Sequence, residues 1–435
     1  MRYSFCPICG SQIRSRLVYD GGAYKLRKIC PEHGRFSAVV WRSAEGELPR
    51  YSAPRETAPP PCASECGLCE RHLQSTCCVL VEVTPRCDLR CPVCFANSGG
   101  AGLGERERTV AEWYDVFRKL VDDGRTFLQL SGGEPTVRDD LPEIVAAAVR
   151  AGCENVQLNS NGVRLGRDPE FTRKLADSGL SFVFMQFDGV TDDAYVTLRG
   201  RALLREKLDA IEQCDRANLG VTLVPTVVPG VNDGQLGEIL KFGFNRSPAV
   251  RGVHFQPISY FGRYPSKPRD SERITLPEII AGLEAQTHGL VKRGDFSHST
   301  CDHPRCGFHG DFVVMPDRIV ALTRRESVSE SCCSPKNGAI SDEALRNRKF
   351  VSRRWKRESL DASGHAEVSG DGFDAFLHAV KRNGFTVTGM AFQDRMTLEV
   401  ERLRRCSLHV CEPDSGRIVP FCAYYNGLAR QQSQA

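Results

Sequence analysis

Six short apolar segments alternate with amphipathic segments between residues 79 and 260 of this 435-residue chain. The apolar segments have the length and residue types of buried strands, and the apolar residues between them recur with helical spacing. The expected strands are residues 79–83, 127–130, 155–159, 182–187, 221–227 and 252–257. This alternation predicts an α/β fold with a parallel sheet and right-handed crossovers. Ligands are then expected where the strands end.

The expected helices follow the strands, at residues 107–122, 139–150, 168–178, 202–217 and 233–243. The first of them carries four apolar residues on one face, Trp113, Val116, Phe117 and Leu120. Six strand–helix units fit either a doubly wound sheet or an incomplete barrel, and they are too few for a barrel of eight units.

Composition excludes several classes of protein. A hydrophobic content of 41% and a charged content of 26% are typical of globular chains and not of disordered ones. No run approaches the ~20 apolar residues of a membrane span, and the N-terminus lacks the apolar core of a signal peptide. We therefore expect a cytoplasmic protein. The net charge of +4 is too small to indicate nucleic-acid binding.

Twenty cysteines in such a protein indicate metal or iron–sulfur sites and not disulfides. Cys87, Cys91 and Cys94 have the spacing CxxxCxxC and follow the first expected strand directly. Three thiolates on one loop can bind three irons of a [4Fe–4S] cluster and leave the fourth iron open to an external ligand. We therefore assign the catalytic cluster to these three cysteines.

The same spacing occurs once more, at Cys62, Cys66 and Cys69, after a proline-rich linker. We expect this set to hold an auxiliary cluster, with Cys77 or its neighbour Cys78 as the fourth ligand. A zinc site made by the same four cysteines is the alternative.

A glycine-rich turn follows the second expected strand, with Gly132 and Gly133 before Glu134. The glycines let a ligand approach the backbone, and the carboxylate can pair with an ammonium group. Together with the cysteine spacing one unit earlier, this segment resembles the radical S-adenosylmethionine (SAM) superfamily. The resemblance implies that the open iron binds SAM and that Glu134 meets its amino group. Reductive cleavage then yields methionine and a 5′-deoxyadenosyl radical, which abstracts hydrogen from an unactivated C–H bond.

Polar residues end the third and fourth expected strands, Asn159 and Ser160 on one and Gln186 and Asp188 on the other. The resemblance implies contacts with SAM or with the substrate, although each residue is equally well explained as a strand-ending turn residue. Many members of the superfamily carry an aromatic residue just before the third cysteine. Here the aromatic residue is Phe95, one position after it, and we expect Phe95 to pack on the adenine.

The N-terminal segment contains Cys6, Cys9, Cys30 and His33 in the pattern CxxC…CxxH. Three sulfurs and one nitrogen give closed tetrahedral coordination, so the role is expected to be structural. The histidine favours zinc over the mononuclear iron of a rubredoxin-like knuckle.

Cysteines near the C-terminus predict a second auxiliary cluster, for which the candidates are Cys301, Cys306, Cys406 and Cys422. Unrelated buried thiols are the alternative. No role is assigned to Cys332, Cys333 or Cys411.

These motifs divide the chain into four parts. We expect a zinc or rubredoxin-like knuckle at 1–45, a linker with auxiliary-cluster ligands at 46–78, the partial (β/α)6 radical SAM barrel at 79–260 and a cysteine-containing extension at 261–435. A very basic segment at 342–360 is either a solvated helix face or a surface for an anionic partner such as lipid head groups.

A closer resemblance rests on residues 62–96, 252–264, 301–307 and 405–425. These segments resemble the tetraether lipid synthase branch of radical SAM proteins and its bacterial relatives. The resemblance implies C–C coupling of lipid alkyl chains, a flavodoxin- or ferredoxin-type reductant and possible peripheral contact with a membrane.

Two alternatives to this function stay open at the level of sequence. One is a peptide- or sulfur-modifying radical SAM enzyme. The other is not an enzyme but an iron–sulfur electron carrier or a zinc-rich interaction protein. A pure carrier would not need the Gly-Gly-Glu segment beside an open three-cysteine cluster.

Overall fold

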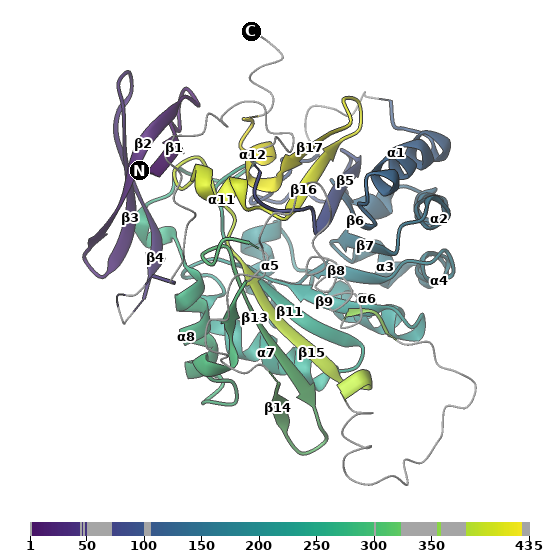
Figure 1. Ribbon diagram of the computed structural model, residues 1–435. Helices are drawn as coiled ribbons and strands as arrows, with labels where there is room; N and C mark the ends of the chain where they lie inside the picture. The colour runs from purple at the N-terminus through teal and green to yellow at the C-terminus, as the bar shows by residue number, and fades with distance from the viewer. Residues whose placement is uncertain are drawn as a thin grey trace.

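The computed structural model describes residues 2–43, 46, 48–49, 72–99, 106–299, 302–322, 355–357 and 380–428. Two sheets organise these residues, one of four strands and one of 13 (Figure 1). In this part of the chain, no helix combines the length and the apolar character that crossing a membrane requires.

The small sheet is antiparallel and comprises β1 (Arg2–Phe5), β2 (Gln12–Asp20), β3 (Ala23–Cys30) and β4 (Gly34–Arg42), in that order. The tight turn between β2 and β3 is formed by Gly21 and Gly22, both with positive φ (59° and 80°). A two-residue hairpin turn of this kind favours glycine because a side chain would be strained there.

The large sheet contains all six predicted strands as neighbours, and adjacent members run parallel. They are β5 (Cys78–Thr84), β6 (Phe127–Gly132), β7 (Asn155–Ser160), β8 (Phe182–Gln186), β9 (Gly220–Val224) and β11 (Val250–Pro257), with the short β10 (Thr226–Val227) beside β11. The predicted α/β class is confirmed. The hydrophobic core is formed by buried apolar side chains of these strands and of the helices that pack on them.

The predicted helices are present as α1 (Val110–Asp122), α2 (Leu141–Ala151), α4 (Pro169–Asp177), α6 (Leu204–Arg216) and α7 (Leu236–Asn245). The first begins three residues later than predicted because Thr109 caps it in a reciprocal pair with Glu112. Among the helices up to Gln286, three were not predicted, α3 (Val163–Arg167), α5 (Asp192–Arg199) and α8 (Leu276–Gln286).

The C-terminal extension lengthens the large sheet at both edges, which its irregular sequence did not predict. β15 (Gly384–Met390) pairs parallel with β11, and β16 (Leu408–Glu412) pairs parallel with β5. Antiparallel strands follow outside them. These are β13 (Gly307–Val314) with β12 (Ser297–His298) and β14 (Ile319–Ala321), and β17 (Arg417–Pro420) at the other edge. Two short helices, α11 (Val400–Arg404) and α12 (Phe421–Tyr425), complete the extension.

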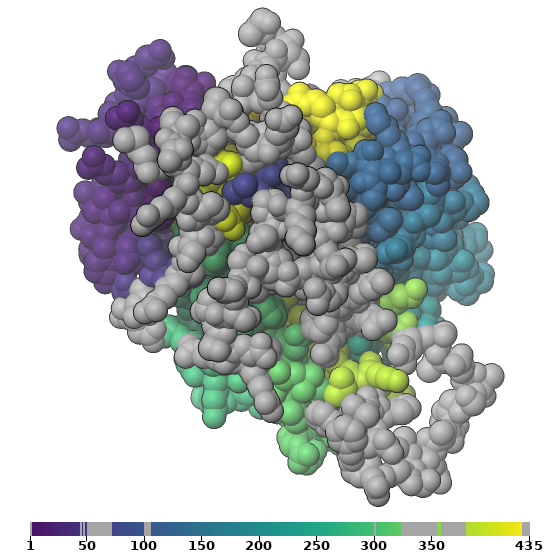
Figure 2. Space-filling view, viewed as in Figure 1, coloured from purple at the N-terminus to yellow at the C-terminus, as the bar shows by residue number. Residues whose placement is uncertain are grey.

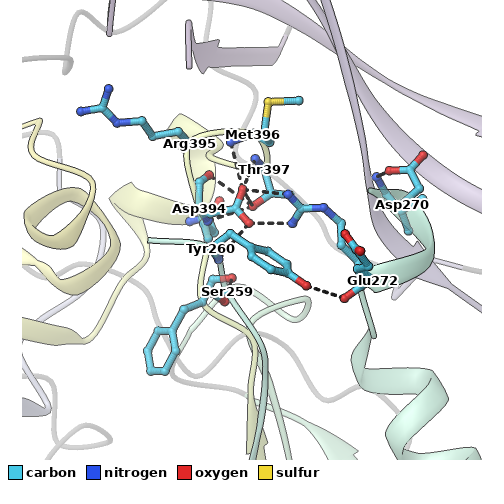
Figure 3. A network of polar contacts seen from close by, with 12 residues as sticks. Ser259, Tyr260, Asp270, Glu272, Asp394, Arg395, Met396 and Thr397 are labelled. Atoms are coloured by element: carbon cyan, nitrogen blue, oxygen red, sulfur yellow. Dashed lines mark hydrogen bonds and ion pairs between the residues drawn. The ribbon is translucent and has the colours of Figure 1, made fainter. Parts of the chain in front are cut away.

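A buried polar network attaches the extension to the segment before α8 (Figure 3). The guanidinium of Arg273 donates to the carboxylate of Asp394 at 2.6 Å, and both side chains are almost fully buried. The backbone N–H groups of Met396 and Thr397 donate to the same carboxylate. Removing one partner of a buried ion pair is costly because it leaves the other charge buried and unpaired. The network therefore fixes the position of the segment around Asp394.

The domain boundaries stay predictions, since the residues between 50 and 71 lie outside the described part of the chain. The same holds for most of the basic segment 342–360, of which residues 355–357 are described. There, Trp355 packs on Phe182 and Phe184, with ring centroids 5.4 and 4.8 Å apart. Arg357 forms an ion pair with Asp215.

Candidate active site and metal site

A cavity of about 470 Å³ lies against the large sheet and is lined by strands of both the predicted core and the extension. Cys87, Cys91 and Cys94 line it, as do Glu134 and Phe95. Asn159, Ser160 and Gln186, which end β7 and β8, are also among its lining residues. Three of the four predicted strand-end residues are thus brought to one cavity, and Asp188 is the exception.

The cysteine loop, residues 85–95, is held in place by an arginine that sequence analysis missed. Arg263 exchanges two backbone hydrogen bonds with Cys94, at 2.9 and 2.8 Å. Its side chain donates to the carbonyl of Cys91 at 2.8 Å and to that of Ser98 at 3.1 Å. The loop therefore has a fixed backbone, although it carries no regular structure.

The Gly-Gly-Glu segment lies directly against the cysteine loop. The N–H of Gly133 donates to the carbonyl of Thr84, and the N–H of Glu134 donates to that of Arg86, both at 2.8 Å. A Cβ on Gly133 would lie 2.0 Å from the Arg86 carbonyl oxygen, and one on Gly132 would lie 2.3 Å from that of Thr84. The approach of a ligand is one reason for these glycines. The structure gives a further reason, because the chain before the cysteines passes against them.

The carboxylate of Glu134 is buried and is oriented by four hydrogen bonds. Its Oε1 accepts from the N–H and hydroxyl of Thr136 and from the hydroxyl of Ser160 at 2.8 Å. Its Oε2 accepts from the N–H of Asn161 at 2.6 Å. Burial raises the pKa of Glu134, and these hydrogen bonds oppose the rise. Oε2 therefore keeps a lone pair for one further donor.

Asp188 does not line the cavity but supports residues that do. Its fully buried carboxylate forms a two-point ion pair with Arg199, at 2.7 and 2.9 Å, and accepts from the side chain of Gln186. Arg199 lines the cavity and donates to the carbonyl of Val93 at 3.0 Å. Its role was not visible in the sequence, since a basic residue at the end of a helix is common.

The thiols of the cysteine loop lie close enough to influence one another. Burial raises the pKa of Cys91, its neighbour Cys94 raises it further, and Arg199 lowers it. Burial raises the pKa of Cys87 to about 12, and nearby carboxylates and then Cys91 raise it in smaller part. Three cysteines that line one cavity beside a guanidinium fit a [4Fe–4S] cluster with three protein ligands.

Lys207 is a second basic residue that the sequence did not indicate. It is fully buried, and burial lowers the pKa of its amine to about 8. The amine donates to the carbonyl of Asn161 and to the side-chain oxygen of Gln186. Lys207 therefore fixes the turn whose N–H holds Glu134.

Phe95 lies in an aromatic group that the extension supplies. Its ring centroid is 5.1 Å from that of Tyr425 and 5.9 Å from that of Phe421. Its expected contact with adenine stays a prediction.

Three neighbouring strands, β11, β15 and β13, contribute a polar wall to the cavity, which consists of His254, His309, Asp311, Thr386 and Thr388. Thr388 stands opposite both histidines in register, and Thr386 stands opposite Asp311. The Nδ1 of His254 lies 2.7 Å from the Thr388 hydroxyl, and the Thr386 hydroxyl donates to Asp311 at 3.2 Å. Burial lowers the pKa of His254 to about 4, so its imidazole is neutral at pH 7.

The metal tetrad of the small sheet consists of Cys6, Cys9, Cys30 and His33, whose ligand atoms all lie within 4.8 Å of one another. The Nδ1 of His33 is 3.7 Å from the sulfur of Cys6 and 3.5 Å from that of Cys30. Tetrahedral ligands at Zn–S distances of about 2.3 Å stand about 3.8 Å apart, so the spacing fits zinc. Hydrogen bonding with the Ser11 hydroxyl lowers the pKa of Cys9 to about 6, which favours the thiolate.

Three of the four cysteines proposed for the C-terminal cluster lie near one another. Burial raises the pKa of Cys406 well above its ordinary value, and both Cys422 and Cys306 raise it further. The Cys306 sulfur accepts from the buried guanidinium of Arg402 at 3.2 Å. Cys301 lies outside the described residues, so the set is not tested as a whole.

Only some of the other cysteines with a predicted role lie among the described residues. Cys62, Cys66 and Cys69 lie outside the described residues, as do Cys332 and Cys333. Cys77 lines the cavity, and its N–H donates to the carbonyl of Ser407 at 2.8 Å. Cys411 is a buried residue of β16.

Two family models match the chain. The model of the radical SAM superfamily matches residues 81–243. A model described as the HMPTM N-terminal zinc ribbon domain matches residues 2–42, which span the small sheet and its metal tetrad.

Among known proteins, a 7,8-dihydro-6-hydroxymethylpterin dimethyltransferase of Methanocaldococcus jannaschii is 30% identical, and the match covers 99% of this chain and 94% of the relative. A GTP 3′,8-cyclase of Nautilia profundicola is 27% identical over 46% of this chain and 62% of its own length. Among solved structures, Streptococcus suis SuiB bound to S-adenosylmethionine is 14% identical with a TM-score of 0.39, over 45% of this chain and 44% of that chain.

Proposed function

The chain belongs to the radical SAM superfamily and is a radical SAM enzyme, and from this premise we propose which of its residues hold the reactants and which substrate class it takes. Cys87, Cys91 and Cys94 hold the SAM-binding [4Fe–4S] cluster, and Glu134 binds the amino group of SAM. When bound, the cluster supplies the electron that cleaves SAM to methionine and a 5′-deoxyadenosyl radical, which abstracts hydrogen from the substrate.

The protein's own residues orient SAM. Asn161 and Ser160 hold the Glu134 carboxylate, so it needs no rearrangement to accept from an ammonium group. Arg199 is held beside the loop by Asp188, and its guanidinium can donate one further hydrogen bond to the carboxylate of SAM or to a thiolate.

We propose that the substrate is a pterin or a similar polar heterocycle and that it is methylated. The polar wall is the observation that carries this. A pterin has a ring N–H beside an amino group, and a carboxylate such as that of Asp311 accepts two parallel hydrogen bonds from such an edge. The neutral His254 offers one further hydrogen-bonding nitrogen, since its Nδ1 is already engaged by Thr388. The similarity of the whole chain to a pterin dimethyltransferase supports this choice.

C–C coupling of lipid alkyl chains, expected from the resemblance to tetraether lipid synthases, is the second candidate. The apolar part of the cavity lining favours it, in particular Phe184, Phe308 and Phe392. Contact with a membrane stays a prediction.

One experiment separates the two candidates. The reconstituted enzyme is incubated with SAM and dithionite, together with either 7,8-dihydro-6-hydroxymethylpterin or a long-chain diether lipid in detergent. Pterin methylation detected by mass spectrometry, and its loss in Asp311→Asn with SAM cleavage retained, supports the first candidate. Lipid dimers formed with no change in the pterin overturn it.

For the remaining cofactors, we propose zinc in the metal tetrad and an auxiliary cluster at the C-terminal cysteines. The electron donor is external, and we propose a flavodoxin- or ferredoxin-type protein for it.

A further inference from the structure

The outer face of the small sheet carries a cluster of arginines. Burial alternates along the first half of β2 and the second half of β3, so that one face packs on the protein and the other meets solvent. The outward residues include Arg14, Arg16, Arg27 and Arg35, all exposed, which we call the basic face. Ile29, which is 60% exposed, lies among them. Figure 2 shows this sheet, in purple, as one flank of the molecule.

Like charges stand next to one another on this face. Arg16 is directly opposite Arg27 across the β2–β3 pair, and Arg35 is opposite Ile29 across the β3–β4 pair. Like charges in such positions destabilise a sheet. Arg27 pairs with Asp20 at 2.6 Å, but within the described residues Arg14, Arg16 and Arg35 have no ion pair.

The other basic residues of the sheet are used to attach it. Arg2 pairs with Glu399, Lys25 with Asp270, and Arg42 with Glu278. The unpaired arginines are therefore those that face away from the protein. The repulsion between these arginines is relieved if an anionic partner binds to the basic face.

The charge of the chain is concentrated in this sheet. Residues 2–42 contain eight lysines and arginines but two acidic residues, a formal charge of +6. The whole chain has +4, so the rest sums to −2. The small sheet is thus a positive module on a slightly negative protein, and such a surface steers an oppositely charged partner.

The inner face of the same sheet leads toward the cysteines of the extension. Lys28, on the inner face, donates to the carbonyl of Arg395 at 2.8 Å. Two residues before Arg395, the N–H of Gln393 donates to the sulfur of Cys422 at 3.3 Å. A partner on the basic face would therefore be separated from the segment 393–395 by the small sheet alone.

We propose that the basic face docks an acidic one-electron carrier protein that reduces this enzyme. The inference rests on the proposed function, because a radical SAM enzyme takes its electron from outside. In the step, the reduced carrier loses one electron and is oxidised, and an iron–sulfur centre of this protein gains that electron. Charge complementarity brings the two together, and Ile29 supplies an apolar contact at the centre of the face.

The test compares two triple variants of the holoenzyme with the same change in net charge. Arg14→Glu, Arg16→Glu and Arg35→Glu reverse the basic face. Arg150→Glu, Arg173→Glu and Arg205→Glu reverse exposed arginines on α2, α4 and α6. Binding of a flavodoxin, an acidic carrier, is measured by fluorescence anisotropy at low and at physiological salt.

The first variant is expected to weaken carrier binding by roughly 30- to 100-fold at low salt, and the second by less than about threefold. SAM cleavage driven by reduced flavodoxin falls with binding, whereas cleavage driven by dithionite stays the same. Equal carrier binding by both variants overturns the proposal. So does a face that binds duplex DNA or anionic vesicles and not the carrier. Absent dithionite-driven cleavage in every protein contradicts the proposed function instead, and the binding result still decides the docking.

Discussion

The metal tetrad of the small sheet and the cysteine loop at the cavity both place cysteines on turns, but they are held in different ways. The four ligands of the tetrad come from one 41-residue segment, and their atoms already lie within 4.8 Å of one another. The cysteine loop depends on residues far away in the chain, among them Glu134, Arg199 and Arg263.

This difference corresponds to a difference in chemistry. A site closed by four protein ligands has no position left for a substrate, and metal binding there becomes folding energy. Three cysteines that line a cavity leave a position open, so their surroundings must supply the charge balance and the ligand contacts. A closed site and an open one should therefore respond differently when a ligand is removed.

The largest effect is expected at the open site. Cys91→Ala should reduce dithionite-driven cleavage of SAM to background, because two cysteines cannot hold the cluster, while the circular dichroism spectrum is unchanged. The matched control is Cys214→Ala, which removes a buried thiol of α6 and should keep most of the cleavage. Cleavage that survives in Cys91→Ala would disprove the assignment of the catalytic cluster.

Breaking the closed site should unfold the small sheet without stopping the chemistry. Cys30→Ser should lower the zinc content by about one per chain and abolish hydrogen-exchange protection in residues 2–42, because a structural zinc contributes ~10 kcal/mol or more to folding. SAM cleavage driven by dithionite should stay within about tenfold of wild type. Protection that persists without metal would show that the sheet is stable on its own core.

A buried ion pair in the extension, next to the small sheet, should make the stability of the protein depend on pH in acid. Glu399 is buried and pairs with Arg305 at 2.7 and 2.8 Å, with Arg2 nearby. Burial alone would raise its pKa, but the arginines outweigh burial and lower it to about 2 from 4.5. The contribution of Glu399 to the free energy of unfolding is therefore fully present above pH 4.5 and is lost as the pH falls toward 2. With ~1.4 kcal/mol per pKa unit, this is about 3 kcal/mol.

Urea unfolding between pH 5 and pH 2.5 measures this contribution. Glu399→Gln should flatten the loss of stability in acid by about that amount. In Glu401→Gln the flattening should be absent, since burial raises the pKa of Glu401. Equal acid profiles for wild type and Glu399→Gln would show that the ion pair contributes nothing net.

The sequence predicted those parts of the molecule that short-range patterns determine. Strand and helix periodicity located the six central strands, and cysteine spacing located the tetrad and the cysteine loop. The edges of the large sheet were not predicted, because β15 and β16 are distant in sequence from the strands they extend. Nothing in a local pattern states which strand will join which edge.

The supporting residues of the site were missed for the same reason. Arg199, Lys207 and Arg263 look like ordinary basic residues of helices and loops, and their importance comes from burial and from partners more than 20 residues away. Asp188 shows the converse. Its position at a strand end suggested a ligand contact, whereas its carboxylate is consumed by Arg199 and Gln186.

The smallest predicted effect concerns Lys207, which acts on the open site through a single turn. Its buried amine donates to the carbonyl of Asn161 and to Gln186, and the N–H of Asn161 in turn holds Oε2 of Glu134. Lys207→Met should leave Glu134 less well placed to bind the amino group of SAM. A hydrogen bond that involves a charged group contributes ~1.5–3 kcal/mol, but only part of this reaches Glu134. We therefore expect the KM for SAM to rise about tenfold with kcat nearly unchanged.

A pH profile distinguishes this positioning role from a merely structural one. Because burial lowers the pKa of Lys207 to about 8, the amine is charged below pH 8 and neutral above it. In the wild type, the KM for SAM should rise as the pH passes upward through 8, and in Lys207→Met this rise should be absent. Lys174→Met removes an exposed lysine that pairs with Glu170 on α4, and it should behave like wild type. A KM that is unchanged in Lys207→Met at every pH would mean that Asn161 and Ser160 hold Glu134 without help from the lysine.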